Sequence, residues 1–297
     1  MTKQYLSPNI VEGVEIELTN HCTLNCITCA RKKRNDFGFM DYATFKKTID
    51  FIRAKKCHEI FLSGHGDVFL HKELFKMINY IFKKYPRINI VIPTKGQAID
   101  SKILKRIKKL QERQFSITLC FSVFSLNQKT YKFLTGGSFK HFMSVVKQAV
   151  DLNLNYTLEF LLTGYNIDEF QKFQSFARSL NIRNYGLALV HHWKGAMTEK
   201  EHQKFFNAKT AKFLKQRRAS ELCEVFQYPA YVFVDYKGKI HLCSNGVDDS
   251  DVLGDVFHGS FQNILRKKRR LNRKKICSRC FMHDHVVFWD INEQYCL

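Results

Sequence analysis

The sequence predicts an α/β protein in which parallel strands alternate with helices over the first two thirds of the chain. Short apolar runs typical of strands alternate with amphipathic helical stretches, and the strand-like run recurs six times before about residue 190. Strands and helices in series require parallel strands joined by right-handed crossovers. After about Lys194 the pattern changes to a polar helical stretch, a hairpin and a cysteine-rich tail. A small α+β domain is therefore expected at the C-terminal end.

The elements of the first part are expected in a regular order. The predicted strands cover about residues 13–20, 59–62, 88–92, 115–123, 156–162 and 185–190. The predicted helices cover about residues 42–52, 74–81, 101–113, 139–152 and 167–180. Asp41 is a plausible N-cap, and Pro86 ends the second helix. An open or partial α/β barrel fits this series, a doubly wound sheet is the alternative, and both place chemistry on the loops after the strands.

The second part begins near residue 195, which divides the chain into residues 1–194 and 195–297. A polar helical stretch runs through Arg218. Residues 231–234 and 239–242 then flank a turn that contains Gly238, which predicts a hairpin. Residues 261–270 are helical in pattern and lead into the cysteine-rich tail.

Composition limits the class of protein. The chain has 297 residues, of which 45% are hydrophobic, enough for a large core. It has no apolar h-region at the start and no run of 18 apolar residues, so we expect a cytoplasmic protein that makes no use of a membrane. In a reducing compartment the ten cysteines indicate metal ligands or reactive thiols rather than disulfides.

Cys22, Cys26 and Cys29 form a C-x3-C-x2-C motif in the loop directly after the first predicted strand. Three thiolates on one short loop can converge on one metal centre, and soft thiolates select iron–sulfur clusters or zinc. The set is one cysteine short of a four-cysteine site, so a cubane held here keeps one iron open, as catalysis requires. The alternative is a zinc knuckle that takes a fourth ligand such as His21.

The motif in this context resembles the hallmark of the radical S-adenosylmethionine superfamily, over about residues 12–190. The resemblance implies a partial (β/α)6 barrel and a [4Fe–4S] cluster whose open iron is chelated by S-adenosylmethionine. It implies reductive cleavage of that cofactor to a 5′-deoxyadenosyl radical, which abstracts a substrate hydrogen. It also implies a protein reductant such as flavodoxin or ferredoxin. Thr28 departs from the family, in which an aromatic residue is usual just before the third cysteine.

Three further segments match positions at which the family binds S-adenosylmethionine. The residues concerned are Gly64, Gly66, Asp67, Thr94 and Ser122. The first three follow the second strand, where the family has a Gly-Gly-Glu-like motif that holds the methionine ammonium, and an ordinary βα turn is the alternative. Thr94 begins a segment that is often Thr-Asn-Gly in the family, and Lys95 replaces the Asn. Ser122 would reach the methionine carboxylate or the ribose, or else be a buried structural serine.

A second set of cysteines lies in the C-terminal part: Cys223, Cys243, Cys277 and Cys280. Four thiolates complete a closed site for an iron–sulfur cluster, although structural zinc is an equal alternative for the set in isolation. After a radical-enzyme barrel, residues 219–281 resemble the auxiliary-cluster domain called SPASM in its shortened twitch form. The resemblance implies one auxiliary [4Fe–4S] cluster with four protein ligands.

Three cysteines remain outside these sets. Cys57 is expected to be inert, and Cys296 could substitute for an auxiliary ligand. Cys120 shares a face of the fourth strand with Ser122, because strand side chains alternate. If that face lines the barrel interior, Cys120 could donate a hydrogen atom to a substrate radical. A buried apolar cysteine is the alternative.

Two functions from different classes fit these features. The first is a radical enzyme; relatives with this layout act on sugars or aminocyclitols, or modify ribosomally made peptides and enzyme active sites. The second is a basic zinc protein that binds nucleic acid. The net charge of +21, and eight basic residues among the ten positions 266–275, favour an acidic peptide or protein as the substrate, with a solvated basic surface as the equal alternative. Nucleic acid is disfavoured as a substrate because no aromatic residue interrupts this basic run.

Overall fold

The computed structural model describes residues 13–52, 57, 59–182, 185–190, 197–216, 231–244 and 248–270. Within these residues nine strands form one sheet in the order β6-β5-β4-β3-β2-β1-β7-β8-β9. The first six strands are all parallel to their neighbours. They are β1 (Gly13–Ile16), β2 (Glu59–Leu62), β3 (Asn89–Thr94), β4 (Ser116–Val123), β5 (Tyr156–Leu162) and β6 (Tyr185–Leu189).

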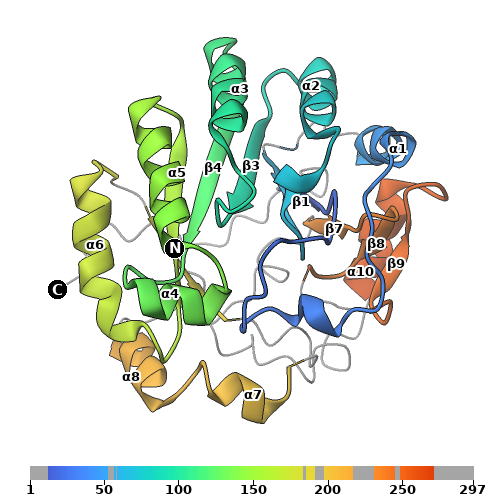
Figure 1. The fold of residues 1–297 in the computed structure, drawn as a ribbon. Coiled ribbons are helices and arrows are strands. Elements are labelled where there is room, and N and C mark those ends of the chain that lie inside the picture. Colours follow the sequence, from blue (N-terminus) through green and yellow to red (C-terminus); the bar gives the residue numbers. More distant parts are fainter. Residues whose placement is uncertain are drawn as a thin grey trace, which may run out of the picture.

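Helices connect the parallel strands and lie in an arc outside them (Figure 1). The helices of the barrel are α1 (Tyr42–Ile52), α2 (Leu74–Lys84), α3 (Ser101–Glu112), α4 (Gln128–Thr135), α5 (Phe139–Asp151) and α6 (Phe170–Ser179). Short 3-10 helices are η1 (Ala30–Lys33), η2 (Val68–Leu70) and η3 (Ile167–Glu169). Beyond β6 the chain forms α7 (Glu199–Gln203) and α8 (Ala208–Gln216), and near the end of the described residues α10 (Phe261–Arg270).

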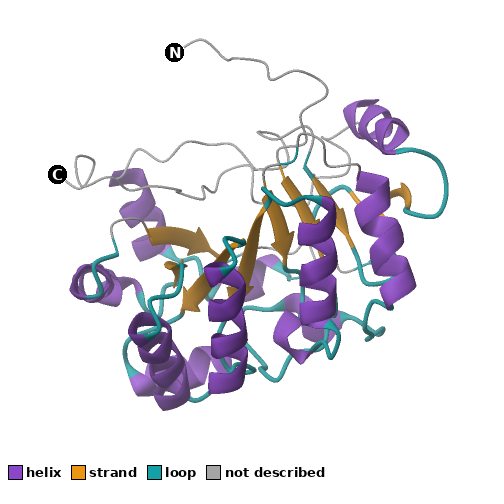
Figure 2. Cartoon of the chain, turned by 90° about the horizontal axis from the view of Figure 1, so that it is seen from above, coloured by secondary structure: helices purple, strands orange, loops and turns teal. Residues whose placement is uncertain are grey.

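The strand order confirms the partial barrel. The order β1 to β6 follows the sequence without reversal, whereas a doubly wound sheet reverses at a switch point. Right-handed crossovers that all run in one direction place their helices on one face of the sheet. Figure 2 shows the strands as an open layer with helices outside it. The described strands at the two ends, β6 and β9, do not pair with each other, so the sheet stays open.

Local sequence explains why the helices form where they do. Asp41 accepts hydrogen bonds from the backbone of Ala43 and Thr44, both at 2.8 Å, which confirms it as the N-cap of α1. Asp100 caps α3 in the same way. The apolar stripe of α2 is buried against the sheet, and this helix ends at Lys84, just before Pro86.

The C-terminal part continues the same sheet. β7 (Val232–Val234) pairs in parallel with β1, then in antiparallel with β8 (Lys239–His241), which pairs with β9 (Val252–Asp255). The predicted hairpin and the predicted helix at 261–270 are thus confirmed. The division of the chain near residue 195 stays a prediction. Among the described helices, none combines the length and the apolar character needed to cross a membrane.

The packing of β5 against α6 in the barrel core can be tested by mutation. Phe160 on β5 is fully buried, with ring centroids 5.8 Å from Phe170 and 4.8 Å from Phe173 of α6. Phe160→Ala should lower the free energy of unfolding by about 3–5 kcal/mol, because it leaves a cavity. Phe133→Ala is the control, since Phe133 is 54% exposed, and it should cost less than about 1 kcal/mol. Urea titrations of anaerobic protein measure both, and equal losses would contradict the packing described.

Candidate cluster and cofactor site

The three cysteines of the first motif lie between β1 and η1. The backbone N–H of Leu24 donates to Cys22 Sγ and that of Arg31 donates to Cys29 Sγ, both at 3.4 Å. The Cys29 N–H donates to the carbonyl of Cys26 at 3.1 Å, which tightens the turn between them. The thiol of Cys26 interacts electrostatically with those of Cys22 and Cys29. All described cysteines are free thiols, so no disulfide competes for these three.

The loop of three cysteines, residues 22–29, is held from outside by the end of α4. The N–H of Asn25 donates to Thr135 O at 3.3 Å, and that of Ile27 donates to Leu134 O at 3.0 Å. Helix α4 lies between β4 and α5 and was not expected from the sequence. The last turn of α4 therefore holds the backbone of the cysteine loop through these two hydrogen bonds.

The loop after β2 packs directly against the same loop. The N–H of Asp67 donates to His21 O at 2.9 Å. A Cβ on Gly66 would lie 2.2 Å from Thr19 O and 2.6 Å from His21 O. Gly64 has φ of +131°, a conformation that favours glycine. The two predicted glycines thus allow close contact between loops; their contact with a cofactor stays a prediction.

Asp67 and Thr94 are brought together by neighbouring strands. Asp67 Oδ1 accepts from Phe69 N at 3.1 Å, and its Oδ2 accepts from Thr94 Oγ1 at 3.2 Å. Burial raises the pKa of Asp67, although the Phe69 hydrogen bond and the charge of Lys95 oppose this. Both side chains are buried at the carboxyl ends of parallel strands, where α/β folds place their chemistry.

Cys120 and Ser122 are buried on β4. The Cys120 thiol interacts electrostatically with Lys95 and with Glu159. Burial raises the pKa of Cys120 well above its usual range, and the Glu159 charge adds to this. The thiol is therefore neutral, the form that carries an S–H hydrogen. Its role as a hydrogen donor, and that of Ser122 in cofactor binding, stay predictions.

Sequence reasoning missed a buried ionic group behind the site. Glu17, which follows β1, accepts a hydrogen bond from His65 N at 2.9 Å, and its Oε1 lies 3.1 Å from His65 Nδ1. Arg34 Nη1 lies 3.8 Å from Glu17 Oε2. Burial tends to raise the pKa of Glu17, but His65 and Arg34 outweigh it and the pKa is lowered. The signal was present, because an acid at an inward position of an apolar strand needs a partner.

Of the second cysteine set the described residues contain Cys243, which follows β8. Its N–H donates to Asp251 Oδ2 at 3.3 Å, and Asp251 Oδ1 lies 2.9 Å from His241 Nδ1. Burial lowers the pKa of His241, but hydrogen bonds to Asp235 and Asp251 outweigh it and raise the pKa to about 9. The other three predicted ligands, Cys223, Cys277 and Cys280, lie outside the described residues, as does Cys296. Cys57 is buried and donates to Glu59 O at 2.9 Å, which fits an inert thiol.

Asp235, His241 and Asp249 also bring ligand atoms within 4.8 Å of one another. Their charges are already balanced within the protein, because Asp249 pairs with Lys239 and the His241 ring meets a carboxylate at each nitrogen. We therefore interpret Asp235, His241 and Asp249 as a structural group that stabilises the β7–β8 hairpin, which precedes Cys243.

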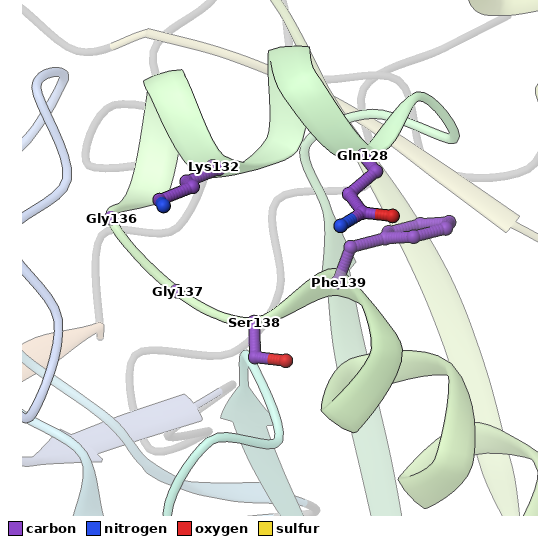
Figure 3. Close-up of a pocket in the computed structure, with 6 residues that line it drawn as sticks. All are labelled: Gln128, Lys132, Gly136, Gly137, Ser138 and Phe139. Carbon is purple, nitrogen blue, oxygen red and sulfur yellow. The ribbon is translucent and has the colours of Figure 1, made fainter.

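A surface pocket of about 310 Å³ lies on the outer side of the α4–α5 turn. Figure 3 shows the side chain of Gln128 on α4 beside the ring of Phe139 at the start of α5, with Lys132, Gly136, Gly137 and Ser138 along the turn that joins the two helices. None of the predicted site residues lines it. The pocket adjoins the cysteine loop, because a Cβ on Gly137 would lie 2.8 Å from the Leu24 side chain.

The sequence model of the Radical SAM superfamily matches residues 16–177, more than half of the chain. The chain belongs to this superfamily. The match begins at the end of β1 and ends within α6, so it contains the cysteine loop and β2 to β5 of the barrel. This radical SAM enzyme therefore uses a [4Fe–4S] cluster and S-adenosylmethionine, and the alternative of a zinc protein that binds nucleic acid is not supported.

Individual relatives agree with this family. The subtilosin biosynthesis protein AlbA of Bacillus subtilis is 21% identical over 276 residues, covering 84% of this chain and 58% of AlbA. The chain thus spans little more than half the length of that relative. Streptococcus suis SuiB bound to precursor peptide SuiA matches with a TM-score of 0.67 at 15% identity, covering 92% of this chain and 70% of SuiB. BtrN in complex with AdoMet and 2-DOIA matches with a TM-score of 0.60 at 15% identity, covering 92% and 93%.

The residues present fit the cluster that the superfamily requires. The thiols of Cys22, Cys26 and Cys29 are free and mutually close, and soft thiolates are the usual ligands of iron–sulfur clusters. Burial raises the pKa of Cys26 to about 11, while the positive charge of Lys95 opposes the shift. Iron binding by Cys26 stays a prediction; it would displace a proton from a buried thiol, a step that the charge of Lys95 would favour.

The contact between the two loops can be tested with one added methyl group. Gly66→Ala should push Asp67 away from the cysteine loop, because its Cβ would overlap the carbonyls of Thr19 and His21. We expect at least a tenfold weaker binding of S-adenosylmethionine and reduced iron at the first site. Gly13→Ala on β1 is the matched control, since its Cβ would meet the nearest atom, in Phe61, at 3.4 Å. Calorimetry and iron analysis measure the outcome, and wild-type values for Gly66→Ala would refute the role of this contact.

Proposed function

We propose that this radical SAM enzyme modifies a peptide or protein substrate with an acidic flank. The observation that carries the proposal is the similarity to AlbA over 84% of the chain, because AlbA takes part in bacteriocin biosynthesis. The fold similarity to SuiB bound to its precursor peptide supports it.

In this proposal the three cysteines hold the cluster and leave one iron for the cofactor. The bound cofactor and cluster together supply a 5′-deoxyadenosyl radical for hydrogen abstraction. Asp67, oriented by Thr94, would accept hydrogen bonds from the methionine ammonium, and Ser122 would donate to the carboxylate or the ribose. These side chains are buried, and such a site would exclude water from the reacting groups.

We also propose one auxiliary cluster held by Cys223, Cys243, Cys277 and Cys280. Support comes from Cys243, whose backbone is fixed by the buried pair of Asp251 and His241 directly after β8. The hairpin that carries Cys243 is joined to the barrel, since β7 pairs with β1. Its tip also contacts the segment after the cysteine loop, because Lys237 Nζ lies 2.8 Å from Asp36 Oδ2.

Iron analysis tests the two-cluster assignment. Reconstituted protein should hold about eight iron atoms, two cubanes of four. Cys277→Ala should lower this to about four while cleavage of S-adenosylmethionine without substrate continues, because the two sets of ligands are separate. Cys57→Ala is the control and should keep all the iron. Loss of both clusters from folded Cys277→Ala protein would contradict two independent sites.

Part of the basic run at residues 266–275 has a structural role. Lys268 is buried and donates to Tyr231 O, and Lys267 donates to Leu253 O at 2.8 Å. Arg266 and Arg270 of α10 are exposed. Residues 271–275 lie outside the described residues. Within α10, the exposed arginines are therefore the groups we propose for docking an acidic flank.

Charge reversal tests this docking. Arg266→Glu with Arg270→Glu should raise KM for an acidic precursor peptide at least fivefold at low salt, and the effect should shrink as salt screens the charges. Cleavage of S-adenosylmethionine without substrate should stay normal. Lys105→Glu on the exposed side of α3 is the control. An unchanged KM in the double variant would contradict docking on these arginines and would favour a small-molecule substrate.

A small-molecule substrate is the second candidate, because BtrN in complex with 2-DOIA matches this chain over nearly its whole length. An acidic precursor peptide that is turned over by this enzyme would decide against it.

We further propose a flavodoxin or ferredoxin as the electron donor, in the cytoplasm. Lys32 on η1, which follows the cysteine loop, and Lys129 and Lys132 on α4, whose last turn is bonded to that loop, are exposed. Such a positive surface attracts an acidic donor protein toward the cluster. The free thiols also fit a reducing compartment.

A further inference from the structure

The residues on both sides of Lys95 are held by hydrogen bonds. Thr94 Oγ1 donates to Asp67 Oδ2 at 3.2 Å and accepts from Gly96 N at 3.0 Å. Asp67 N in turn donates to the carbonyl of His21, the residue before Cys22. This chain of contacts joins the loop after β3 to the cysteine loop. These hydrogen bonds therefore fix the backbone position of Lys95.

The ammonium group of Lys95 faces inward. Its side chain is half-buried, and Nζ lies 5.3 Å from the centroid of the Phe124 ring, which follows β4. The Lys95 charge interacts with the thiols of Cys22, Cys26 and Cys29 and with Asp67. Among the described residues no carboxylate forms an ion pair with Nζ within 4.0 Å. A partly desolvated ammonium without a close counter-ion is unfavourable, so the site needs an anion beside it.

The anion that fits is the cluster itself. Three thiolates around an oxidised cubane leave a net negative charge, and one-electron reduction adds another. A fixed positive charge nearby stabilises the reduced state more than the oxidised state. Net charge close to a cluster is one of the factors that set its reduction potential.

We propose that Lys95 is the built-in counter-charge of the cluster and raises its reduction potential. The proposal rests on the assignment of Cys22, Cys26 and Cys29 to that cluster. Lys95 gains and loses neither an electron nor a proton in this role. The single electron comes from an external reductant and stays on the cluster.

The test is a redox titration of the cluster by electron paramagnetic resonance, on full-length protein without S-adenosylmethionine. Cys277→Ala removes the auxiliary signal, so the titration is done in that background. Lys95→Met should shift the midpoint potential to a more negative value, and Lys95→Arg should recover most of the shift. Lys105→Met, which removes an exposed lysine on α3, is the control and should leave the midpoint unchanged.

The outcomes separate this proposal from the proposed function. Absence of a cluster signal in the parent protein refutes the cluster assignment, whereas an unchanged midpoint in Lys95→Met refutes only the role of Lys95. An unchanged midpoint with weaker binding of S-adenosylmethionine would overturn the proposal in favour of a contact with the cofactor. If Lys95→Met fails to hold iron, Lys95→Gln and Lys95→Arg are compared. Iron retained in the Arg variant alone supports a counter-charge, and iron lost from folded protein in both overturns it.

Discussion

The cluster assignment that we propose requires three thiolates from an eight-residue loop to reach one centre and leave a position open, and the rest of the site is arranged around this constraint. A loop of that length has no regular structure of its own to hold it. Its backbone is therefore bonded on one side to the last turn of α4 and on the other to the loop after β2. The parallel order of β1, β2 and β3 makes this possible, because it brings the loops after these strands to one edge of the sheet.

The charged groups around the cysteine loop are buried or half-buried, so each of them needs a neighbouring group that stabilises its charge. Glu17 is ionised at the back of the site because Arg34 and His65 lie beside it. Asp67 is buried with Thr94 as its hydrogen-bond donor, and Lys95 carries the positive charge that faces the thiols. Each group would be costly alone in such an environment. Together these groups form a set of buried charges beside the loop. The ammonium and carboxylate of S-adenosylmethionine, and a separate anionic cluster, would complete this set.

Much of the fold could be predicted because its signals are local. The stripe of α2 and the N-cap of α1 lie in the sequence where the structure has them. Helix α4 was missed because Gln128–Thr135 is short and mixes polar with apolar residues, although its local end signals were present in Asn127, which caps its start, and in Gly136, which ends it in a left-handed conformation. The pairing of β7 with β1 was missed for a different reason, since no local pattern reveals a partner more than 200 residues away. A basic run in the sequence does not show which of its side chains are exposed, since Lys268 belongs to such a run but is buried and donates to Tyr231 O.

The central claim is that the loop of residues 22–29 holds the cluster that cleaves S-adenosylmethionine. The most direct measurement is the amount of 5′-deoxyadenosine formed by anaerobic, dithionite-reduced protein, compared with the variant in which Cys22, Cys26 and Cys29 are all Ala. The account predicts steady formation by the parent protein and none above background by the triple variant, which should still fold. Continued formation of 5′-deoxyadenosine by the triple variant would contradict it.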